Sequence, residues 1–418
     1  MIGFCPVMVK PCDRGKEKLA SVKITDSLYA VGILNPALRV FDIVMETKYG
    51  TTYNSYLLKG TEKNVLVETA HLQYFDRYLE NIREVIDPSK IDYIVLNHNE
   101  PDHTGCVEKL LDYMPNATIL ISKAGSIYLK NIINRSDAKI QVVKDEETID
   151  IGGKTLKFLM APFLHWPDSM FTWVEEEKTL FSCDFLGAHY CEPYMFDTNM
   201  AYPEKYEEGF TYYYQAIFGP FKPYVLAGLE KIKGLDIQRV CNSHGPILTK
   251  GCRLEYAMDC YRTWSQPRSN EKTTIPIFYT SAYGNTRQIA QAIQEGILEA
   301  KPDANVTLHD IIHEDMGQLA DLLNSSDGFA LGSPTINGDA VPPAWILLSH
   351  VDAINNKKKP VLLFGSYGWS GEAVPNLTAR VTGLKMKPFE EGLKVAFAPS
   401  KADLEKAKET GKKFAESM

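Results

Sequence analysis

Short apolar runs separated by polar loops form the dominant pattern in the first two thirds of the chain. Strand-like runs are expected at residues 53–58, 65–68, 93–97 and 118–122. Helical periodicity lies between them, at residues 75–86, 107–113 and 125–133. Short strands then prevail as far as Phe185, and residues 206–232 form a long aromatic and apolar helical region. This alternation, followed by a strand-rich part, predicts sheets that are covered by helices.

A second and more regular pattern begins after the polar segment 264–272. Strand-like runs near Ile275, Val306, Phe329, Leu362 and Val395 alternate with helices and make five βα units. Such repetition is typical of a doubly wound parallel sheet. The sequence therefore predicts an α/β protein with a first domain at 1–263, a linker at 264–274 and a second domain at 275–418.

The composition is typical of a globular protein and argues against some classes of binding partner. The chain has 418 residues, 44% hydrophobic and 23% charged, which leaves room for two domains. Its 45 basic and 53 acidic residues give a formal net charge of −8, which argues against a nucleic-acid or anionic-membrane partner. The apolar patch before Lys10 is too short for a signal peptide, and no later stretch is long enough to cross a bilayer. We therefore expect a cytoplasmic protein.

The eight cysteines include no Cys-x-x-Cys pair. Neither a thiolate zinc site of that kind nor an in-chain rubredoxin module is therefore expected. In a cytoplasmic protein these cysteines are expected to be reduced and mostly structural.

Four side chains that can bind metal follow the apolar run 91–96 within six residues: His98, Glu100, Asp102 and His103. A buried strand holds the root of such a loop rigid while the loop carries polar groups. An extended loop would point His98, Glu100 and Asp102 to one side and His103 to the other. One short loop could thus serve two adjacent metal ions.

A simpler interpretation is a helix N-terminus, with Asp102 capping a segment that begins at Thr104. Four possible ligands in six residues favour the metal interpretation. Three further candidates, His165, Asp184 and His244, each follow a predicted strand. A single histidine after a strand is more often a surface or hydrogen-bonded residue than a ligand, so the repeated placement carries the argument.

The second domain carries three loops rich in glycine and hydroxyl groups, at 280–286, 332–338 and 365–371. The first precedes a helix with apolar positions at Ile289, Ala292, Ile293 and Ile297. Its backbone N–H groups, hydroxyls and helix dipole suit a phosphate. All three loops follow parallel-type strands, at the sheet edge where open doubly wound sheets bind ligands.

These motifs resemble a known family over almost the entire chain. The second half resembles a flavodoxin domain, whose Ser-x-x-Gly-x-Thr phosphate loop matches Ser281 to Thr286. The first half resembles the metallo-β-lactamase αββα fold in the variant His-x-Glu-x-Asp-His, followed by His, Asp and His. This order of domains and ligands is similar to the flavodiiron proteins, or A-type flavoproteins, which reduce oxygen to water or nitric oxide to nitrous oxide.

The resemblance implies a site for two irons. His98, Glu100 and His165 would hold one iron, Asp102, His103 and His244 the other, and Asp184 would bridge them. Carboxylate-rich sites with imidazoles suit iron or manganese better than zinc, and a flavin in the same chain favours redox chemistry over hydrolysis. Tyr190 is a candidate hydrogen-bond donor to the bound substrate, with a packed core tyrosine as the alternative. Two departures are Asp42, where many members carry histidine after the Arg-x-Phe segment, and about twenty additional residues at the N-terminus.

The resemblance also implies a flavin on the three loops. FMN is favoured over FAD, because the first loop lacks the Gly-x-Gly-x-x-Gly dinucleotide signature. We expect Trp369 to stack on the flavin ring, with packing between helices as the alternative. The expected FMN-binding residues are Ser281, Tyr283, Gly284, Asn285, Thr286, Pro334, Thr335, Ile336, Asn337, Ser366, Tyr367, Gly368, Trp369, Ser370 and Gly371.

Together these features predict a flavodiiron oxidoreductase that reduces O₂ or NO. The alternatives are a binuclear zinc hydrolase with a flavin-binding regulatory domain and a non-catalytic electron carrier. The electron donor is expected to be a separate molecule, such as rubredoxin or a reduced deazaflavin. A short linker does not by itself turn the flavin loops towards the metal loops of the same chain. We therefore expect a head-to-tail homodimer, or a dimer of such dimers, in which each flavin faces the partner's irons.

Overall fold

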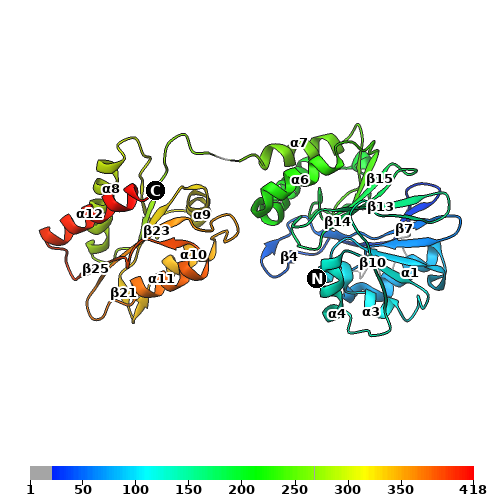
Figure 1. Ribbon diagram of the computed structural model, residues 1–418, viewed down its shortest axis with the longest axis horizontal. Coiled ribbons are helices and arrows are strands. Elements are labelled where there is room, and N and C mark those ends of the chain that lie inside the picture. Colours follow the sequence, from blue (N-terminus) through cyan, green and yellow to red (C-terminus); the bar gives the residue numbers. More distant parts are fainter. Residues whose placement is uncertain (1–20, 268) are drawn as a thin grey trace, which may run out of the picture. The chain divides into compact units, whose positions relative to one another are not determined.

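The computed structural model describes residues 21–267 and 269–418 (Figure 1). Its internal contacts divide the chain into two compact units, Met1–Gln266 and Pro267–Met418. This division falls within the segment 264–274, whose first residue is still the last residue of helix α7 (Leu254–Trp264). The predicted N-terminal extension lies outside the described residues.

Two sheets form the centre of the first unit. The first sheet contains β1 Val22–Lys23, β2 Leu28–Ala30, β7 Tyr56–Lys59, β8 Asn64–Val67, β9 Tyr93–Leu96, β10 Thr118–Ile121 and β11 Lys139–Val142, in this order. The second contains β12 Thr148–Asp150, β13 Thr155–Met160, β14 Met170–Val174, β15 Thr179–Cys183, β16 Arg239–Asn242 and β17 Leu248–Thr249. Strands β8 to β11 are parallel, as are β15 and β16.

Helices cover the outer face of each sheet. Helices α1 (Phe75–Val85), α3 (Val107–Leu110) and α4 (Lys123–Ile132) pack on the first sheet, and α5 (Pro203–Tyr213), α6 (Lys222–Ile232) and α7 on the second. Alternate residues of one strand enter different cores, because successive side chains of a strand point to opposite faces. Leu66 packs under the helices, whereas Val65 and Val67 pack between the sheets. The first unit thus has the predicted αββα layers.

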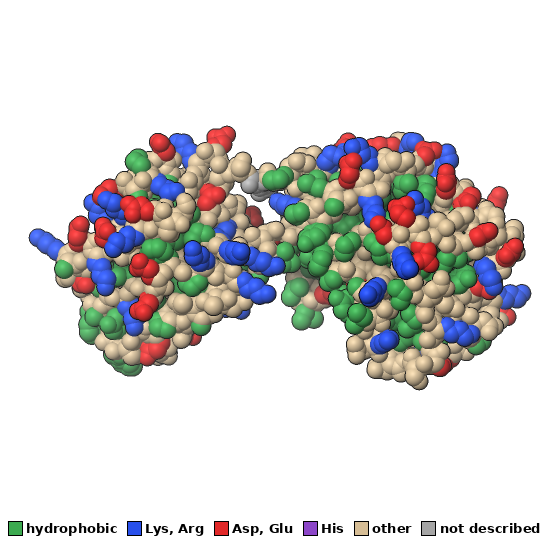
Figure 2. Space-filling view, in the orientation of Figure 1, with side chains coloured by type: hydrophobic (Ala, Val, Ile, Leu, Met, Phe, Trp, Pro, Cys, Tyr) green, Lys and Arg blue, Asp and Glu red, His purple; other side chains and the backbone are tan. Residues whose placement is uncertain are grey.

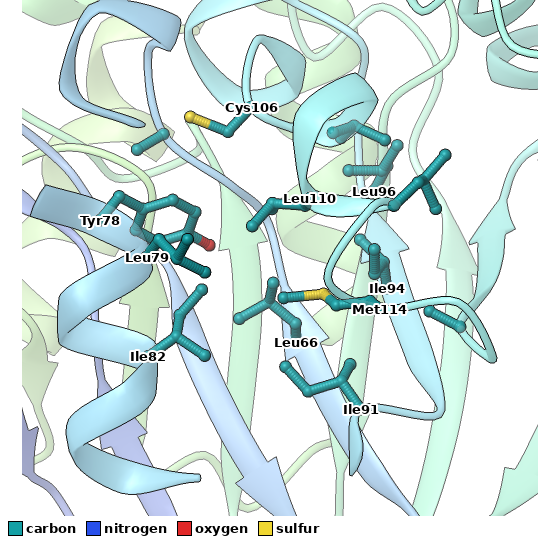
Figure 3. Packing of buried hydrophobic residues seen from close by; sticks show 14 of the residues in the cluster. Leu66, Tyr78, Leu79, Ile82, Ile91, Ile94, Leu96, Cys106, Leu110 and Met114 are labelled. Atoms are coloured by element: carbon teal, nitrogen blue, oxygen red, sulfur yellow. The ribbon is translucent and has the colours of Figure 1, made fainter. Parts of the chain in front are cut away.

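Figure 3 shows the helix-covered core of the first sheet. Tyr78, Leu79 and Ile82 of α1 project towards Leu66, and Leu110 and Met114 lie over the strands beside Ile94. Strands β8, β9 and β10 are buried on both faces, which explains why each reads in the sequence as a nearly continuous apolar run. This packing holds the end of β9, where the predicted metal loop begins.

The strand expected at residues 53–58 is wrong as a single element. Residues Thr51–Tyr53 form β6, which pairs with β3 (Ile33–Asn35), and the chain then crosses to β7 in the first sheet. Asn54 lies at the crossing, where its backbone N–H donates to the Ser243 carbonyl at 2.8 Å and its amide to the Gly245 carbonyl at 2.9 Å. The break therefore anchors the loop that carries His244.

The helical region predicted at 206–232 is interrupted. Helix α5 continues into a π-helical segment, Tyr214–Phe218, and a 3₁₀ turn, Gly219–Phe221, before α6 begins. Pro220 and Pro223 lack the backbone N–H that a continuous helix needs. A short hairpin elsewhere in this unit pairs β4 (Val40–Phe41) with β5 (Met45–Glu46).

The second unit is a doubly wound sheet, as predicted. Its parallel strands are β19 Leu308–Asp310, β18 Ile277–Tyr279, β20 Phe329–Gly332, β23 Pro360–Tyr367 and β24 Lys387–Pro388, in this order, with β25 Leu393–Ala396 also paired to β23. Helices α8 (Asn285–Ala300) and α12 (Lys401–Glu416) pack on one face. Helices α9 (Met316–Ser325), α10 (Pro342–Ser349) and α11 (Ala373–Gly383) pack on the other.

Charged side chains of both signs are interspersed on the surface seen in Figure 2, in both units. This distribution agrees with the small acidic excess of the sequence. None of the helices in the described part of the chain is long and apolar enough to cross a membrane.

Replacing Leu66 by alanine should lower the free energy of unfolding of the first unit by about 2–5 kcal/mol, because a fully buried leucine leaves a cavity. The change can be measured by urea unfolding followed by circular dichroism. The matched control is Val142→Ala on the same sheet, because Val142 is 41% exposed. Equal effects of the two changes would contradict the packing described above.

Candidate metal centre and flavin loops

Four strand ends bring the seven predicted metal ligands together. His98 and Glu100 follow β9, His165 follows β13, Asp184 follows β15 and His244 follows β16. The chain is not extended through the whole metal loop, because Pro101–Thr104 forms the short helix α2. Asp102 therefore does not cap a helix beginning at Thr104, and the simpler interpretation of this residue is wrong. The helical turn, rather than strand-like alternation, separates Asp102 and His103 from His98 and Glu100.

Four of these side chains form the first group: His98, Glu100, His165 and Asp184. His165 Nε2 lies 3.1 Å from Glu100 Oε2 and 2.9 Å from Asp184 Oδ2. His98 Nε2 lies 3.3 Å from the same Glu100 oxygen and 3.6 Å from the same Asp184 oxygen. Two imidazole nitrogens and two carboxylate oxygens thus converge on one small volume.

The second group consists of Asp102, His103 and His244. Asp102 Oδ2 lies 3.2 Å from His103 Nε2 and 3.1 Å from His244 Nε2. The second oxygen of Asp184, Oδ1, lies 3.1 Å from His103 Nε2 and 3.6 Å from His244 Nε2. Asp184 therefore presents one oxygen to each group, as a carboxylate between two metal ions would.

The donor set fits two divalent metal ions. Both carboxylate oxygens of Asp102, Asp184 Oδ1 and both ring nitrogens of His103 are buried and accept or donate no hydrogen bond. Buried polar groups are normally satisfied, so this concentration of unsatisfied atoms indicates a ligand. Three carboxylates and four imidazoles suit iron or manganese, which prefer oxygen and imidazole donors.

Without a bound metal, the groups stabilise one another as ion pairs. Burial is the largest influence on the pKa of His165 and lowers it, but hydrogen bonds with Asp184 and Glu100 outweigh burial and raise the pKa to about 9. Burial likewise lowers the pKa of His244, but the negative charges of Asp184 and Asp102 raise it to about 9. Burial alone would raise the pKa of Glu100, whereas hydrogen bonds from His165 and His98 bring it well below its ordinary value.

Tyr190 is not brought to the metal ligands. Its hydroxyl donates to Glu192 and to the Tyr202 carbonyl, at 3.3 Å from the latter. The preceding residue, His189, faces the centre instead, with its ring 5.1 Å from that of His244 and its Nδ1 2.9 Å from Thr51 Oγ1.

Sequence reasoning missed His189. Burial and the charge of His244 hold its pKa well below the ordinary value, so the imidazole is neutral. His189 also lines a cavity of about 510 Å³ together with Tyr49, Glu208 and Gln215. The signal in the sequence was a histidine one residue before the chosen tyrosine, in a segment whose irregular backbone hides which side chain turns inwards.

Asp42 lies beside the candidate metal centre. It adopts a left-handed backbone conformation, with φ 45°, at the turn of the β4–β5 hairpin. Partial burial, the hydrogen bond with Glu100 and the charges of Glu100 and Asp102 raise the pKa of the Asp42 carboxyl to about 6. The turn of this hairpin therefore places a fourth carboxyl group beside the three of the candidate metal centre.

The three predicted flavin loops lie at the carboxyl ends of β18, β20 and β23, which are neighbours in the sheet. Helix α8 begins directly after Gly284, whose φ of 84° is the left-handed conformation that glycine adopts freely. Thr286 Oγ1 lies 2.9 Å from Ser366 Oγ and links the first loop to the third. Tyr283 and Trp369 are 92% and 91% exposed, so both aromatic rings are free to stack on a flat ligand.

The second and third loops differ from the prediction in detail. Strands β21 (Thr335–Ile336) and β22 (Asp339–Ala340) form a hairpin, whose turn residues Asn337 and Gly338 have φ of 52° and 71°. An Asn-Gly pair is the sequence signature of such a turn. Strand β23 extends to Tyr367, because its end pairs with β25. The free part of the third loop therefore begins at Gly368.

Metal binding should displace protons from His165 and His244. Because both folded pKa values, about 9, exceed the ordinary value near 6.5, their ion pairs stabilise the metal-free protein fully below about pH 6.5, and this contribution disappears as the pH rises through about 9. Titration with Mn²⁺ in buffers of different ionisation enthalpy should release about two protons from these imidazoles at pH 7 and about one at pH 9. An equal proton release at the two pH values would contradict this assignment.

Comparison with known proteins agrees with this arrangement in both units. Residues 51–245 match the sequence profile of the ODP family beta lactamase, and residues 277–411 match that of flavodoxin. The chain is 51% identical to the flavo-diiron protein FprA2 of Clostridium acetobutylicum over 96% of this chain and 100% of that protein. It is 37% identical to the type A flavoprotein fprA of Rhodobacter capsulatus, over 95% of this chain and 91% of the relative.

Solved structures of flavodiiron proteins also match this chain over both of its domains. Rubredoxin oxygen:oxidoreductase from Desulfovibrio gigas superimposes with a TM-score of 0.69 and 29% identity, over 95% of this chain and 98% of that one. Both domains and their order are therefore shared with relatives that match over nearly their whole length. The chain belongs to the flavodiiron proteins, also called type A flavoproteins, which are FMN- and diiron-dependent oxidoreductases.

Proposed function

We propose that this chain reduces O₂ to water or NO to N₂O at the buried centre, with electrons relayed through FMN. The observation that carries the proposal is Asp184, which presents one oxygen to each of the two ligand groups. A site for a single metal ion would not require the two oxygens of one carboxylate to face two separate groups of ligands. The family assignment supports the same reaction, and one relative is named a rubredoxin oxygen:oxidoreductase.

The proposed iron ligands follow the two groups. His98, Glu100 and His165 would hold one iron and Asp102, His103 and His244 the other, with Asp184 between them. When bound, two irons would supply Lewis acidity to bind and polarise the gas, and FMN would supply electrons one or two at a time. The protein holds the ligands nearly free of solvent, which strengthens every electrostatic interaction around the reacting gas.

A binuclear zinc hydrolase is the less favoured function. Glu100 occupies a position where zinc hydrolases with this spacing usually have a neutral histidine, and the added carboxylate makes the site harder and more anionic. Hydrolysis also needs no flavin, whereas the flavodoxin match covers most of the second unit.

The electron donor is proposed to be a separate molecule, such as rubredoxin or a reduced deazaflavin. The six described cysteines are free and none forms a Cys-x-x-Cys pair. The proposed assembly is a head-to-tail homodimer, alone or as a dimer of dimers, because a two-fold arrangement can place each flavin next to the partner's irons. The proposed location is the cytoplasm.

Loss of one iron ligand should abolish gas reduction. His98→Ala should lower the bound iron from about two per chain to about one or less, because His98 is one of only four side chains that would hold the first ion. It should remove O₂ and NO consumption alike. Iron analysis and gas electrodes with a reduced donor measure both. His313→Ala, at an exposed position, is the control. Stoichiometric zinc in the wild-type protein, together with hydrolytic activity and no gas reduction, would refute the proposed function.

Loss of one hydroxyl should weaken FMN binding without touching the metals. Thr286 is buried at the start of α8 and pairs with Ser366, so Thr286→Ala should raise the dissociation constant of FMN about tenfold, as expected for the loss of a hydrogen bond to a charged group. Flavin fluorescence measures the constant, and iron content should stay unchanged. Thr378→Ala, whose hydroxyl only bonds the Val374 carbonyl within α11, is the control. Release of FAD rather than FMN on denaturation would refute the cofactor assignment.

Mixed dimers should recover activity that neither parent has. One parent carries His98→Ala with His244→Ala, and the other carries a substitution that prevents FMN binding. Subunit exchange then places the intact flavin of one chain next to the intact irons of the other, so about one working pair per mixed dimer is expected. Inactive mixed dimers, verified by native mass spectrometry, would place electron transfer within one chain.

A further inference from the structure

The two ring nitrogens of His98 face different environments. Nε2 points to Glu100 and Asp184 in the first ligand group, at 3.3 and 3.6 Å from the nearest carboxylate oxygens. Nδ1 points away from that group and lies 2.5 Å from the sulfur of Cys183. Both residues are buried. If Nε2 binds a metal, the proton must remain on Nδ1, and Cys183 is then its hydrogen-bond acceptor.

The corresponding histidine of the second group has a different partner. His244 Nδ1 lies 2.6 Å from the carbonyl oxygen of Thr52, and its Nε2 faces Asp102. A carbonyl oxygen is a strong hydrogen-bond acceptor, whereas a thiol sulfur is a weak one. The acceptor behind a metal-bound imidazole sets the basicity of that ligand. One histidine ligand of the first proposed iron therefore has a weaker hydrogen-bond acceptor than one histidine ligand of the second.

The backbone is strained where this support is built. Cys183, the last residue of β15, has φ 53°. Glu68, the residue directly after β8, has φ 58°. Left-handed conformations are uncommon for residues other than glycine, and they cluster at functional sites. At Cys183 the pairing with β16 also shifts its register, and such irregularities re-aim a side chain.

Glu68 completes the arrangement behind His98. One of its oxygens accepts the backbone N–H of Asn97 at 3.0 Å, and thereby fixes the residue before His98. Its other oxygen is buried without a hydrogen-bond partner. Ligand atoms of Glu68, His98 and Cys183 all lie within 4.8 Å of one another. Two strained residues from different sheets thus converge on the back of a single metal ligand.

We propose that Cys183 is a positioning residue for His98: its sulfur accepts the Nδ1–H bond, fixes Nε2 towards the first iron and makes that iron the easier of the two to reduce. The second effect follows because the weaker acceptor leaves the His98 imidazole less basic than that of His244, and a less basic ligand stabilises the reduced metal. The inference rests on the proposed iron ligands.

The test compares three variants of the full-length, FMN-loaded protein. Cys183→Ala removes the acceptor, Cys183→Ser replaces sulfur by a stronger oxygen acceptor, and Cys241→Ala is the control. Cys241 is also buried, in the adjacent strand β16, where its neighbour across the pairing is Phe181. The readouts are iron affinity, measured by competition with a chelator, and the two iron midpoint potentials, measured by a redox titration followed by electron paramagnetic resonance.

We expect Cys183→Ala to weaken the binding of one iron about tenfold or more, as is usual when the partner of a metal-bound histidine is lost. Cys183→Ser should retain iron and shift one of the two potentials downwards, while Cys241→Ala should change neither quantity. If Cys183→Ala does not fold, the potential of Cys183→Ser decides. Affinity and potentials equal to those of the wild type in the folded Cys183 variants would overturn the inference. A wild-type protein without two irons would instead overturn the proposed function.

Discussion

The structure depends on burying three carboxylates and four imidazoles against one another. A buried carboxylate or imidazolium is costly unless opposite charges or a metal compensate it. Asp184 shares its two oxygens between the imidazoles of both groups, and Glu100 and Asp102 each face two of them. No single element can supply this set. Two sheets and four strand ends are needed, and the apolar cores on either side of the sheets hold those ends in place.

The same constraint connects the fold to redox chemistry. A site with three carboxylates neutralises much of the charge of two divalent ions, so that electrons can be added or removed at modest cost in electrostatic energy. The second unit supplies a separate, exposed site for a flat cofactor, at the carboxyl ends of three adjacent strands. In that unit the chemistry resides in loops, and the sheet only positions them. The first unit therefore provides a buried metal centre, and the second provides an exposed flavin-binding site.

Much of this could be predicted from the sequence, because the decisive signals are local. Seven candidate ligands placed just after apolar runs, and three glycine- and hydroxyl-bearing loops after parallel-type strands, can be recognised in the sequence alone. Interactions that depend on the path of the chain between elements were not visible. Local propensity does not fix whether His189 or Tyr190 turns inwards, because an irregular segment has no side-chain period. Glu68 and Cys183 were overlooked because their role depends on a left-handed backbone conformation at strand ends. This conformation can be predicted from the sequence only where the residue is glycine.

Other misses have similar causes. The turn from Glu100 into α2 depends on Pro101, which is equally compatible with an extended loop and a first helical turn. The crossing at Asn54 depends on hydrogen bonds to a loop almost two hundred residues away. In both cases tertiary contacts decided between local alternatives. The consequence for function is that the candidate metal-binding side chains could be selected from the sequence, whereas the side chains that orient them required the structure.

The central claim is that two irons occupy the two groups joined by Asp184. Anomalous diffraction from crystals of the aerobically purified protein, measured at the iron and zinc absorption edges, tests it most directly. The account predicts two iron peaks, one within bonding distance of Glu100 and His165 and the other of Asp102 and His244, with Asp184 touching both. A single peak, two zinc peaks, or iron located elsewhere in the chain would contradict it.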